Sequence, residues 1–376
     1  MLDGNGDRRL RVLHVILNLG ETNGQYNEHC LPMLDMRDIS ICTYFEPQLT
    51  PPRAIHLFAG DGHLRGFFRA LHRAFGSGPH DIVHVHAPQT GGLVVLALLA
   101  RFRYARLRSS MVYTVQDSFY DYSLRNQALM VVALAGFKRI IFCSRAAYDS
   151  LPRIWQWLVG GRWRVVQNAA DIDRVDRAVA ATSVTRAENA FTVISVGRLE
   201  RVKDPATLVD AFARGVDRSC RLVLVGAGTL ESAIRAQIAE LGVEDCVTLT
   251  GLVPRDEVFV RCAAADVMVS TSHGEGLPVA VIEAMAAECP VILSDIPPHR
   301  ELADGANFIS LIAPRDTDAF AREIHRFREM SLMDLRELGR KSREHVTARY
   351  SLPKMHAGVE AVYQELSVSG DSTIRS

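Results

Sequence analysis

The residues best suited to chemistry lie in one stretch, HGEGLPVAVIEAMAAECPVILSD at positions 273–295. Glu275 stands between two glycines, and Glu283 follows eight positions later, inside a run of small and apolar residues that predicts a helix. With a rise of about 1.5 Å per residue, Glu283 lies roughly 7–8 Å along that helix. A carboxylate there can accept hydrogen bonds from a ribose diol, while Glu275 can reach hydroxyl groups on the other side of the helix start. The spacing suits a nucleotide sugar, with one sugar ring at each end.

The start of the same helix favours an anion between the two rings. Pro278 fits the first helical turn, where its missing N–H does no harm, and Gly276 and Leu277 offer backbone N–H groups before it. Such an amino end is a ready anion site. In VGRLERVKDP, Arg198 and Lys203 follow a predicted strand and can neutralise a diphosphate from the opposite side.

A third predicted strand end adds two glycines. In LVGAGTLE, Gly226 and Gly228 follow a strand and precede a helix. Each feature is ordinary when it stands alone, because the glycines make a common turn, Glu283 suits a solvated helix face and basic residues are frequent at surfaces. Their placement at three successive strand ends is what predicts a site.

Short runs of β-branched and apolar residues alternate with helix-length segments through most of the chain. They cover residues 11–17, 39–45, 54–58, 81–86, 111–115, 139–144, 164–168, 191–197, 221–228, 246–251, 267–272, 290–295 and 307–311. Because these runs are apolar on both faces, they predict parallel sheets covered by helices. The expected fold class is α/β, with two doubly wound parallel sheets that bind ligands at the carboxyl ends of their strands.

A polar segment rich in Ala, Thr and Ser at residues 171–190 separates the two series of strands. It predicts a linker with room for one short helix. We therefore expect an amino-terminal domain at residues 1–180 and a second domain at residues 181–350. Helical patterns extend over residues 317–349 and 353–366, and a disordered tail is expected after them.

Taken together, GRLERVKD, LVLVGAG, GLVP and the segment with the two glutamates resemble the retaining GT-B glycosyltransferases of family 4, which carry an E-x7-E motif. These elements stand in the family's order within about residues 191–295. The resemblance implies two Rossmann-like domains that face each other across a cleft, a nucleotide-sugar donor domain in the second half, and a last helix, within residues 351–376, that crosses back to the first domain. It also implies transfer that retains the anomeric configuration, without a metal or another cofactor.

The resemblance also implies roles for single residues. Arg198 and Lys203 bind the diphosphate and act with Glu275 in catalysis, and Glu283 binds the ribose. The other implied donor-binding positions are Gly20, Gly24, Gly226, Gly228, Val253, Gly276, Leu277 and Pro278.

The first half matches the family less closely. Gly20 and Gly24 lie in LNLGETNGQYNEHC, where relatives place a glycine-rich loop against the donor phosphate, but a plain turn is an equal interpretation because no two glycines are adjacent. VHVHAPQTG places His84 and His86 on one face of a strand. No third metal ligand is evident from the sequence, so no metal site is predicted. His86 either lines the acceptor side of the cleft or is a satisfied strand-end histidine.

Gln116 is the second acceptor-side candidate. It follows the run MVYTV, at a point where many relatives carry a histidine. Glutamine can hydrogen-bond a sugar hydroxyl but cannot accept a proton near neutral pH. Retaining transfer by departure from the front face tolerates this, since the leaving phosphate can take the proton.

The pair Asp171 and Asp173 mimics the D-x-D metal motif of GT-A glycosyltransferases. The motif is short, and the two series of strands argue against a single GT-A domain, so we interpret it as a polar turn.

Two basic stretches lie in the first half. Arg65, Arg69 and Arg73 form one row of a predicted amphipathic helix, and four arginines fall within residues 101–108. They suit either peripheral contact with a membrane or a lipid-phosphate acceptor, or simply solvated helix faces.

Composition narrows the class of protein. Lys plus Arg equals Asp plus Glu, at 43 each, so no overall field attracts nucleic acid. The seven cysteines are odd in number and lack C-x-x-C spacing, which predicts reduced, buried thiols in a cytoplasmic protein. No apolar stretch is long enough to span a membrane.

We therefore expect a retaining hexosyltransferase that uses a nucleotide sugar, UDP before GDP, and a hydroxyl acceptor on a polysaccharide, lipid-linked glycan or secondary metabolite. A dinucleotide-dependent oxidoreductase is disfavoured because Glu231 stands where the third glycine of its fingerprint belongs. A sugar-nucleotide epimerase and an inactive nucleotide-sugar-binding homologue stay open.

Overall fold

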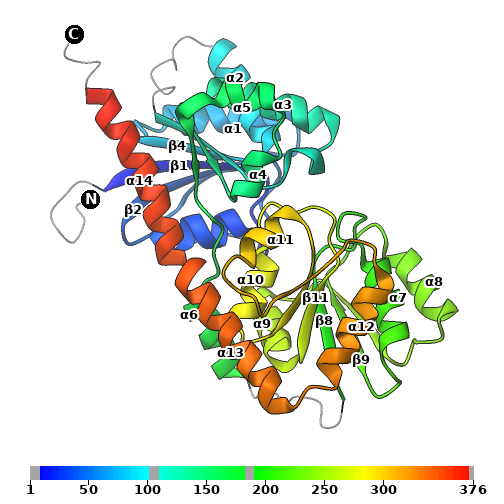
Figure 1. The fold of residues 1–376 in the computed structure, drawn as a ribbon. Helices are drawn as coiled ribbons and strands as arrows, with labels where there is room; N and C mark the ends of the chain where they lie inside the picture. Colours follow the sequence, from blue (N-terminus) through cyan, green and yellow to red (C-terminus); the bar gives the residue numbers. More distant parts are fainter. Residues whose placement is uncertain (1–8, 101–109, 183–189, 372–376) are drawn as a thin grey trace. The chain divides into compact units, whose positions relative to one another are not determined.

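The computed structural model describes residues 9–100, 110–182 and 190–371. They form two α/β units (Figure 1). The first unit comprises Met1–Gln167 and Met355–Ser376, and the second comprises Asn168–Lys354. Each is built on one parallel sheet, which confirms the predicted fold class.

The first unit has a seven-stranded sheet in the order β3-β2-β1-β4-β5-β6-β7. The strand order reverses between β1 and β4, because β1 pairs in parallel with both β2 and β4. Its strands are β1 (Leu10–Ile16), β2 (Arg37–Thr43), β3 (His56–Phe58), β4 (Ile82–His86), β5 (Met111–Val115), β6 (Arg139–Phe142) and β7 (Trp163–Val165). Its helices are α1 (Leu64–Gly76), α2 (Pro88–Ala100), α3 (Leu124–Gly136), α4 (Arg145–Asp149), α5 (Arg153–Val159) and α14 (Leu352–Asp371), with the short turns η1 (Gln25–Cys30), η2 (Leu31–Met33), η4 (Phe119–Asp121) and η5 (Gly160–Arg162).

The second unit has a six-stranded sheet in the order β10-β9-β8-β11-β12-β13, which reverses between β8 and β11. Its strands are β8 (Thr192–Val196), β9 (Arg221–Val225), β10 (Val247–Gly251), β11 (Val267–Ser270), β12 (Val291–Ser294) and β13 (Ser310–Ile312). Its helices are α6 (Ile172–Ala181), α7 (Pro205–Gly215), α8 (Glu231–Glu240), α9 (Arg255–Ala264), α10 (Val279–Ala286), α11 (Pro297–Leu302), α12 (Thr317–Arg328) and α13 (Leu332–Arg349).

The strands lie where the sequence predicts them. Each predicted run overlaps one observed strand. Most strands lie within their run, while β1, β2 and β7 begin before it and β13 ends one residue after it. The central strands are buried on both faces, as β4 and β5 show along their whole length. All seven cysteines are buried and free, which confirms the prediction of buried thiols.

The segment expected to be a linker belongs to the second unit, and the boundary lies earlier than residue 180. Helix α6 begins at an N-cap, Asp171, whose side chain accepts a hydrogen bond from the Arg174 amide. The helix packs on α9, buries Val175 and pairs Arg174 with Asp256 at 2.6 Å. The predicted polar turn at Asp171 is therefore a helix cap, and residues 183–189 lie outside the described part of the chain.

The end of the chain is more helical than predicted. The pattern over residues 317–349 divides into α12 and α13, because Ser331 caps a new helix by accepting a hydrogen bond from the Asp334 amide. Helix α14 continues to Asp371, five residues past the predicted end. Once a helix exists, each added residue gains a backbone hydrogen bond at little further entropic cost, so a polar sequence alone does not end it.

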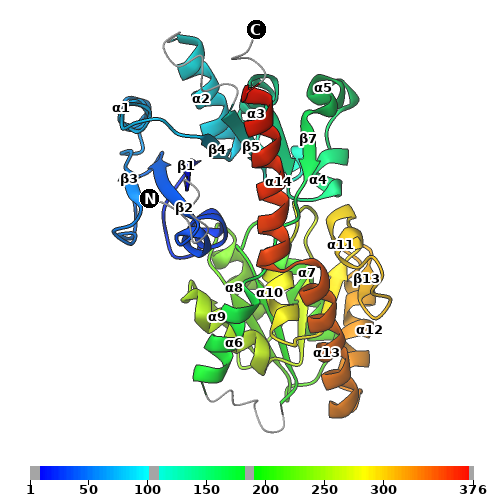
Figure 2. The same ribbon diagram turned by 90° about the vertical axis from the view of Figure 1, so that its left-hand side faces the viewer.

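Helix α14 belongs to the first unit from Met355 on, and Figure 2 shows its course. Specific side-chain contacts hold it to the sheet of that unit. Glu360 pairs with Arg37 of β2, and Glu365 pairs with Arg139 of β6 at 2.7 Å. Tyr363, which is fully buried, contacts His84 of β4. The carboxyl-terminal helix thus crosses three strands of the amino-terminal sheet.

Candidate functional site

The strand reversal in the second sheet brings the two predicted catalytic segments together. Since β8 and β11 are neighbours whose following chains diverge, their carboxyl ends form the topological switch point, where open α/β sheets bind ligands. The loop after β8 carries Arg198 and Lys203, and the loop after β11 carries Glu275. Strand order therefore explains why residues more than 70 positions apart share one site.

The centre of this site is an ion pair between two predicted site residues. Lys203 Nζ lies 2.5 and 2.6 Å from the two carboxylate oxygens of Glu275. The Glu275 side chain is buried and also accepts a hydrogen bond from Ser272 Oγ at 2.8 Å. Ser294, at the end of β12, donates in turn to the Ser272 carbonyl at 2.5 Å. The sequence predicted both charges but not that they bind each other.

Further hydrogen bonds fasten the loop after β8 to the loop after β11. The His273 amide donates to the Val202 carbonyl at 2.7 Å, and Thr271 Oγ1 donates to the Asp204 carbonyl at 2.8 Å. The carboxylate of Asp204 lies 2.8 Å from His273 Nε2 and caps α7. The two loops therefore form one fixed surface.

Arg198 differs from Lys203 in its surroundings. Its side chain is exposed, and its guanidinium makes no hydrogen bond or ion pair with the residues that the structure describes. All donors of the Arg198 guanidinium are therefore available to a ligand, whereas two of the three donors of Lys203 are used by Glu275.

Close backbone packing leaves no room for a side chain at the two glycines after β9. Gly226 has a φ of +133°, and a Cβ there would lie 2.0 Å from the Gly197 carbonyl oxygen. A Cβ on Gly228 would lie 2.3 Å from the Leu199 carbonyl oxygen. The loop after β8 therefore packs directly on this turn, and contact of Gly226 or Gly228 with a phosphate stays a prediction.

The predicted anion-binding helix is α10. Pro278 is its N-cap rather than its first residue, and no side chain caps the helix within the described chain. Its first amides lack an intrahelical acceptor by position. Leu277 is buried, and its carbonyl accepts a hydrogen bond from Asn168 Nδ2 at 3.2 Å, which fixes the turn that follows Gly276.

Glu283 has a partner that the sequence analysis missed. Arg255, the first residue of α9, donates from Nε to Glu283 Oε1 at 2.9 Å and from a terminal nitrogen to the same oxygen. Both side chains are about nine-tenths buried. In the sequence, the only sign of this partner was that an arginine directly follows GLVP. Val253 of that motif is half-buried between β10 and α9.

The first-unit candidates lie on different loops, after β1 and after β5. Gly20 and Gly24 lead into η1, a π-helical turn in which Glu28 and His29 are buried. Gln116 is the first residue after β5, and its carbonyl accepts a hydrogen bond from Cys143 Sγ at 3.2 Å. No observation on these residues decides a role, so their assignments stay predictions.

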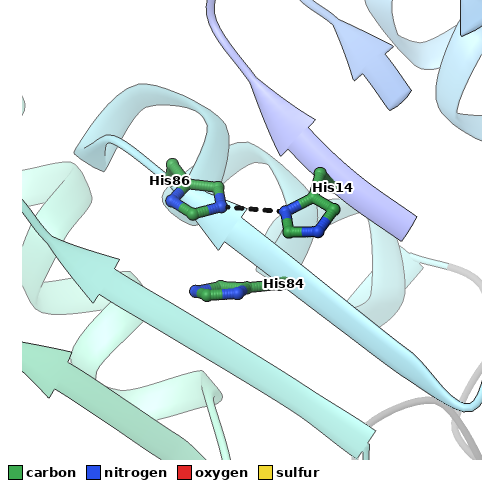
Figure 3. Close-up of side chains that lie close together, drawn as sticks. All are labelled: His14, His84 and His86. Atoms are coloured by element: carbon green, nitrogen blue, oxygen red, sulfur yellow. Dashed lines mark hydrogen bonds between the residues drawn. The ribbon is translucent and has the colours of Figure 1, made fainter. Parts of the chain in front are cut away.

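His86 is not exposed at the strand end but buried against a third histidine. His14 of β1 lies opposite His84 of β4 in the sheet register, and its Nδ1 is 3.2 Å from His86 Nε2 (Figure 3). Burial, with neighbouring histidines adding to it, holds the pKa of all three well below its ordinary value. The sequence does not reveal this cluster, because His14 is about 70 residues away from His84 and His86.

Comparison with known families agrees with the geometry. The family model described as glycosyl transferases group 1 matches residues 177–345, and the model described as Glycosyltransferase Family 4 matches residues 40–174. Together they span most of the chain, and the first includes Arg198, Lys203, Glu275 and Glu283.

The chain belongs to the group 1 glycosyltransferases of the GT-B fold.

Two curated relatives and one solved structure illustrate the similarity of this glycosyltransferase to known proteins. It is 22% identical to the UDP-Gal:alpha-D-GlcNAc-diphosphoundecaprenol alpha-1,3-galactosyltransferase of Escherichia coli, over 90% of this chain and 87% of that one. It is 30% identical to the GDP-mannose:cellobiosyl-diphosphopolyprenol alpha-mannosyltransferase of Xanthomonas oryzae, over 47% and 45%. The structure of Anabaena HepE in complex with UDP and glucose matches with a TM-score of 0.73, 18% identity and coverage of 96% and 100%.

Of the two basic stretches predicted in the first half of the glycosyltransferase, the structure describes one. Arg65, Arg69 and Arg73 lie on the exposed face of α1, as predicted, and Arg69 pairs with Asp61 at 3.3 Å. The arginines within residues 101–108 lie outside the described residues. Among the described helices, none is both long and apolar enough to cross a bilayer.

The close packing at Gly226 predicts a large cost for a side chain there. Gly226→Ala should destabilise the glycosyltransferase by about 3 kcal/mol or more, because both the backbone conformation and the Gly197 carbonyl oppose a Cβ. Gly242→Ala is the matched control, since Gly242 also has a positive φ but open space around it, and should cost only about 1 kcal/mol. Urea unfolding measures both, and equal losses would contradict the packing argument.

Proposed function

We propose that this glycosyltransferase transfers a hexose or N-acetylhexosamine from UDP to a hydroxyl group and retains the anomeric configuration. The acceptor is a lipid-linked glycan or growing polysaccharide, with a secondary metabolite as the remaining class. The observation that carries the proposal is the Lys203–Glu275 pair at the switch point of β8 and β11, beside an exposed Arg198 and the uncapped start of α10.

The diphosphate is held by positive charge from two directions. An ammonium has three N–H donors, and Glu275 accepts two hydrogen bonds from Lys203, which leaves one donor for a phosphate oxygen. Arg198 offers a planar pair of donors that suits a phosphate. The first amides of α10 supply the remaining stabilisation without needing to reorganise.

Catalysis then consists of positioning and charge stabilisation. As the bond from the sugar to the diphosphate breaks, charge develops on the leaving oxygen, and Arg198, Lys203 and the α10 amides stabilise it. That oxygen takes the proton of the acceptor hydroxyl on the same face, so Gln116 need only hydrogen-bond the sugar. The proposal includes no metal or organic cofactor in the transfer step.

Glu283 binds the ribose through a carboxylate that Arg255 holds in place. Both hydrogen bonds from Arg255 end on Oε1. A ribose hydroxyl can donate to the other oxygen, Oε2, five residues along α10 from the phosphate-binding end.

The names of similar proteins support the donor and acceptor classes. The Escherichia coli relative uses UDP-Gal with a diphosphoundecaprenol acceptor, and the HepE structure contains UDP and glucose. The Xanthomonas relative uses GDP-mannose with a diphosphopolyprenol acceptor, so the nucleotide is the part of the proposal that most needs a test.

A panel of nucleotide sugars tests the donor. UDP-sugars should raise the melting temperature of the full-length protein more than GDP-, ADP- or TDP-sugars at equal concentration, because only a bound donor stabilises the folded state. Product analysis with a lipid-linked acceptor should show retained configuration. Turnover of the sugar nucleotide without any acceptor would support an epimerase instead, and no shift with any sugar nucleotide would overturn the proposal.

The Arg255 contact determines which variant can test Glu283. Glu283→Ala would leave a buried guanidinium without its counter-charge, at a cost of about 3–5 kcal/mol, so a loss of activity would be ambiguous. Glu283→Gln also removes the charge but keeps an oxygen that accepts hydrogen bonds from Arg255, so it should lose less stability than Glu283→Ala and still fold, while kcat/KM for the UDP-sugar falls roughly 10²-fold. Glu257→Gln on α9, which removes an exposed ion pair with Arg261, is the control and should retain full activity. Full activity of Glu283→Gln would remove the ribose assignment.

A lipid-linked acceptor implies contact between the first unit and a membrane surface. Large apolar side chains are exposed on α2, α3 and α5, which pack together: Leu96, Leu99, Leu124, Ile154 and Trp157. Helix α1 adds its exposed arginine row. An aromatic side chain and basic residues are what an anionic membrane surface attracts, so we infer a cytoplasmic enzyme bound peripherally at the inner face of the membrane.

Trp157 is the residue that tests membrane contact. It is 82% exposed, so Trp157→Ser should leave the fold intact while lowering co-sedimentation with anionic vesicles roughly threefold or more. Met333→Ser, which removes an exposed apolar side chain from α13 in the second unit, should have no effect. Binding that is the same for anionic and neutral vesicles, or for both variants, would contradict the inference.

A further inference from the structure

The central strands of the first sheet bury three histidines on one face. His14 of β1 and His84 of β4 are register partners, and His86 follows His84 by two residues, the spacing that returns a side chain to the same face. All three are 1% exposed or less. Figure 3 shows the three rings close together, with His14 on β1 and His84 and His86 on β4.

The three rings are close enough to share one ion. His14 Nδ1 lies 3.2 Å from His86 Nε2, and the centroids of the His84 and His86 rings are 4.2 Å apart. One nitrogen from each histidine can be chosen so that all three lie within 4.8 Å of one another. Two nitrogens bound at about 2.0–2.1 Å to a tetrahedral Zn²⁺ ion would be separated by roughly 3.4 Å, close to the His14–His86 distance.

The hydrogen bond between His14 and His86 leaves one nitrogen of each ring without a hydrogen-bond partner among the described residues. Each neutral imidazole has one N–H and one lone pair, and the bond between them uses one of each. The remaining nitrogens, His14 Nε2 and His86 Nδ1, are buried and have no hydrogen-bond partner in the described chain. Whichever ring donates, one imidazole lone pair and one N–H are therefore left unused in the interior. If both rings instead carry their protons on His14 Nε2 and His86 Nδ1, the two lone pairs face each other across 3.2 Å, and one ion between them can use both.

His84 has the second contacts that a metal-binding histidine needs. Its Nδ1 lies 2.7 Å from the Tyr363 hydroxyl, and its Nε2 lies 2.6 Å from Thr114 Oγ1. If one hydroxyl yields to an ion, the other still accepts the ring N–H and fixes the orientation of the ring. The hydroxyls come from α14 and β5, so both elements would sense an ion at the cluster.

We propose that His14, His84 and His86 bind one divalent transition-metal ion, with Zn²⁺ the first candidate, inside the amino-terminal unit. Neutral imidazoles suit Zn²⁺, Co²⁺ and Ni²⁺, and three of them leave a fourth position open for water or for His29, whose ring centroid is 5.2 Å from that of His86. The ion lies in the unit that lacks Arg198, Lys203 and the α10 amides, so it stabilises the fold and takes no part in transfer. The proposal does not depend on the proposed function.

Charge around the cluster is compatible with a dication. Arg37 is the charged side chain that reaches both His14 and His84 electrostatically, and on its own it would repel an ion. Arg37 is, however, paired with Glu360 of α14 and stacked on the Tyr363 ring at 4.8 Å. Its charge is therefore largely balanced before an ion enters.

The test uses the full-length protein, treated with a chelator and then titrated with Co²⁺ or Zn²⁺ alone. We expect one equivalent per chain, visible absorption typical of tetrahedral Co²⁺ with nitrogen ligands, and a melting temperature higher by roughly 5 °C at 100-fold excess over the dissociation constant. These readouts need neither nucleotide sugar nor activity. Absence of stoichiometric binding to the unaltered protein would overturn the proposal.

Variants locate the ion. His86→Gln and His14→Gln should each lower the affinity for Co²⁺ at least tenfold and abolish the thermal shift. His80→Gln is the matched control, because His80 is buried in the same unit with both ring nitrogens unpartnered among the described residues, yet lies outside the cluster. Binding that survives in both cluster variants, or that is lost equally in the control, would contradict the assignment.

Discussion

The part-buried ion pair between Lys203 and Glu275 is the interaction on which the candidate site depends. A carboxylate that is 7% exposed needs a charged partner, because an unpaired buried charge costs several kcal/mol. Lys203 provides that partner from a different strand end, and Ser272 adds a hydrogen bond. The pair therefore fixes the loops after β8 and β11 to each other and sets the place where α10 begins.

This arrangement also explains how one glutamate can serve both structure and donor binding. Glu275 positions Lys203 by two hydrogen bonds, and in the proposed function the third donor of the ammonium binds a phosphate oxygen. Further along α10, Glu283 likewise accepts hydrogen bonds from a basic residue, Arg255. In both cases a pair of opposite charges is built into the fold, and the proposed ligand uses the hydrogen-bonding capacity that the pair leaves over.

The sequence predicts the strands of this protein well because a parallel strand buried on both faces leaves a compact, local pattern. The runs at β4, β8 and β11 need no knowledge of distant residues. Strand ends also reveal charged residues such as Arg198 and Lys203, since a polar residue after an apolar run is visible locally.

Contacts between residues that are far apart in the chain could not be predicted from the sequence. The contacts of Glu275 with Lys203, of Glu283 with Arg255 and of His14 with His86 each depend on strand order or helix packing, which no local pattern encodes. The segment around α6 was interpreted as a linker for the same reason: its polar face suggested solvent, while the packing of Val175 against the second unit became visible only in three dimensions.

The most direct measurement is a double-mutant cycle on the unfolding free energy of Lys203→Met, Glu275→Gln and the combined variant. Each single substitution leaves one partner of a part-buried pair, so we expect a loss of about 1–3 kcal/mol for Lys203→Met, which leaves the buried carboxylate without its cation, and a smaller loss for Glu275→Gln. The double variant should lose clearly less than the two single losses combined, with a coupling energy of about 1–3 kcal/mol. Additive losses would show that the two side chains do not support each other, and the account of the site would be wrong.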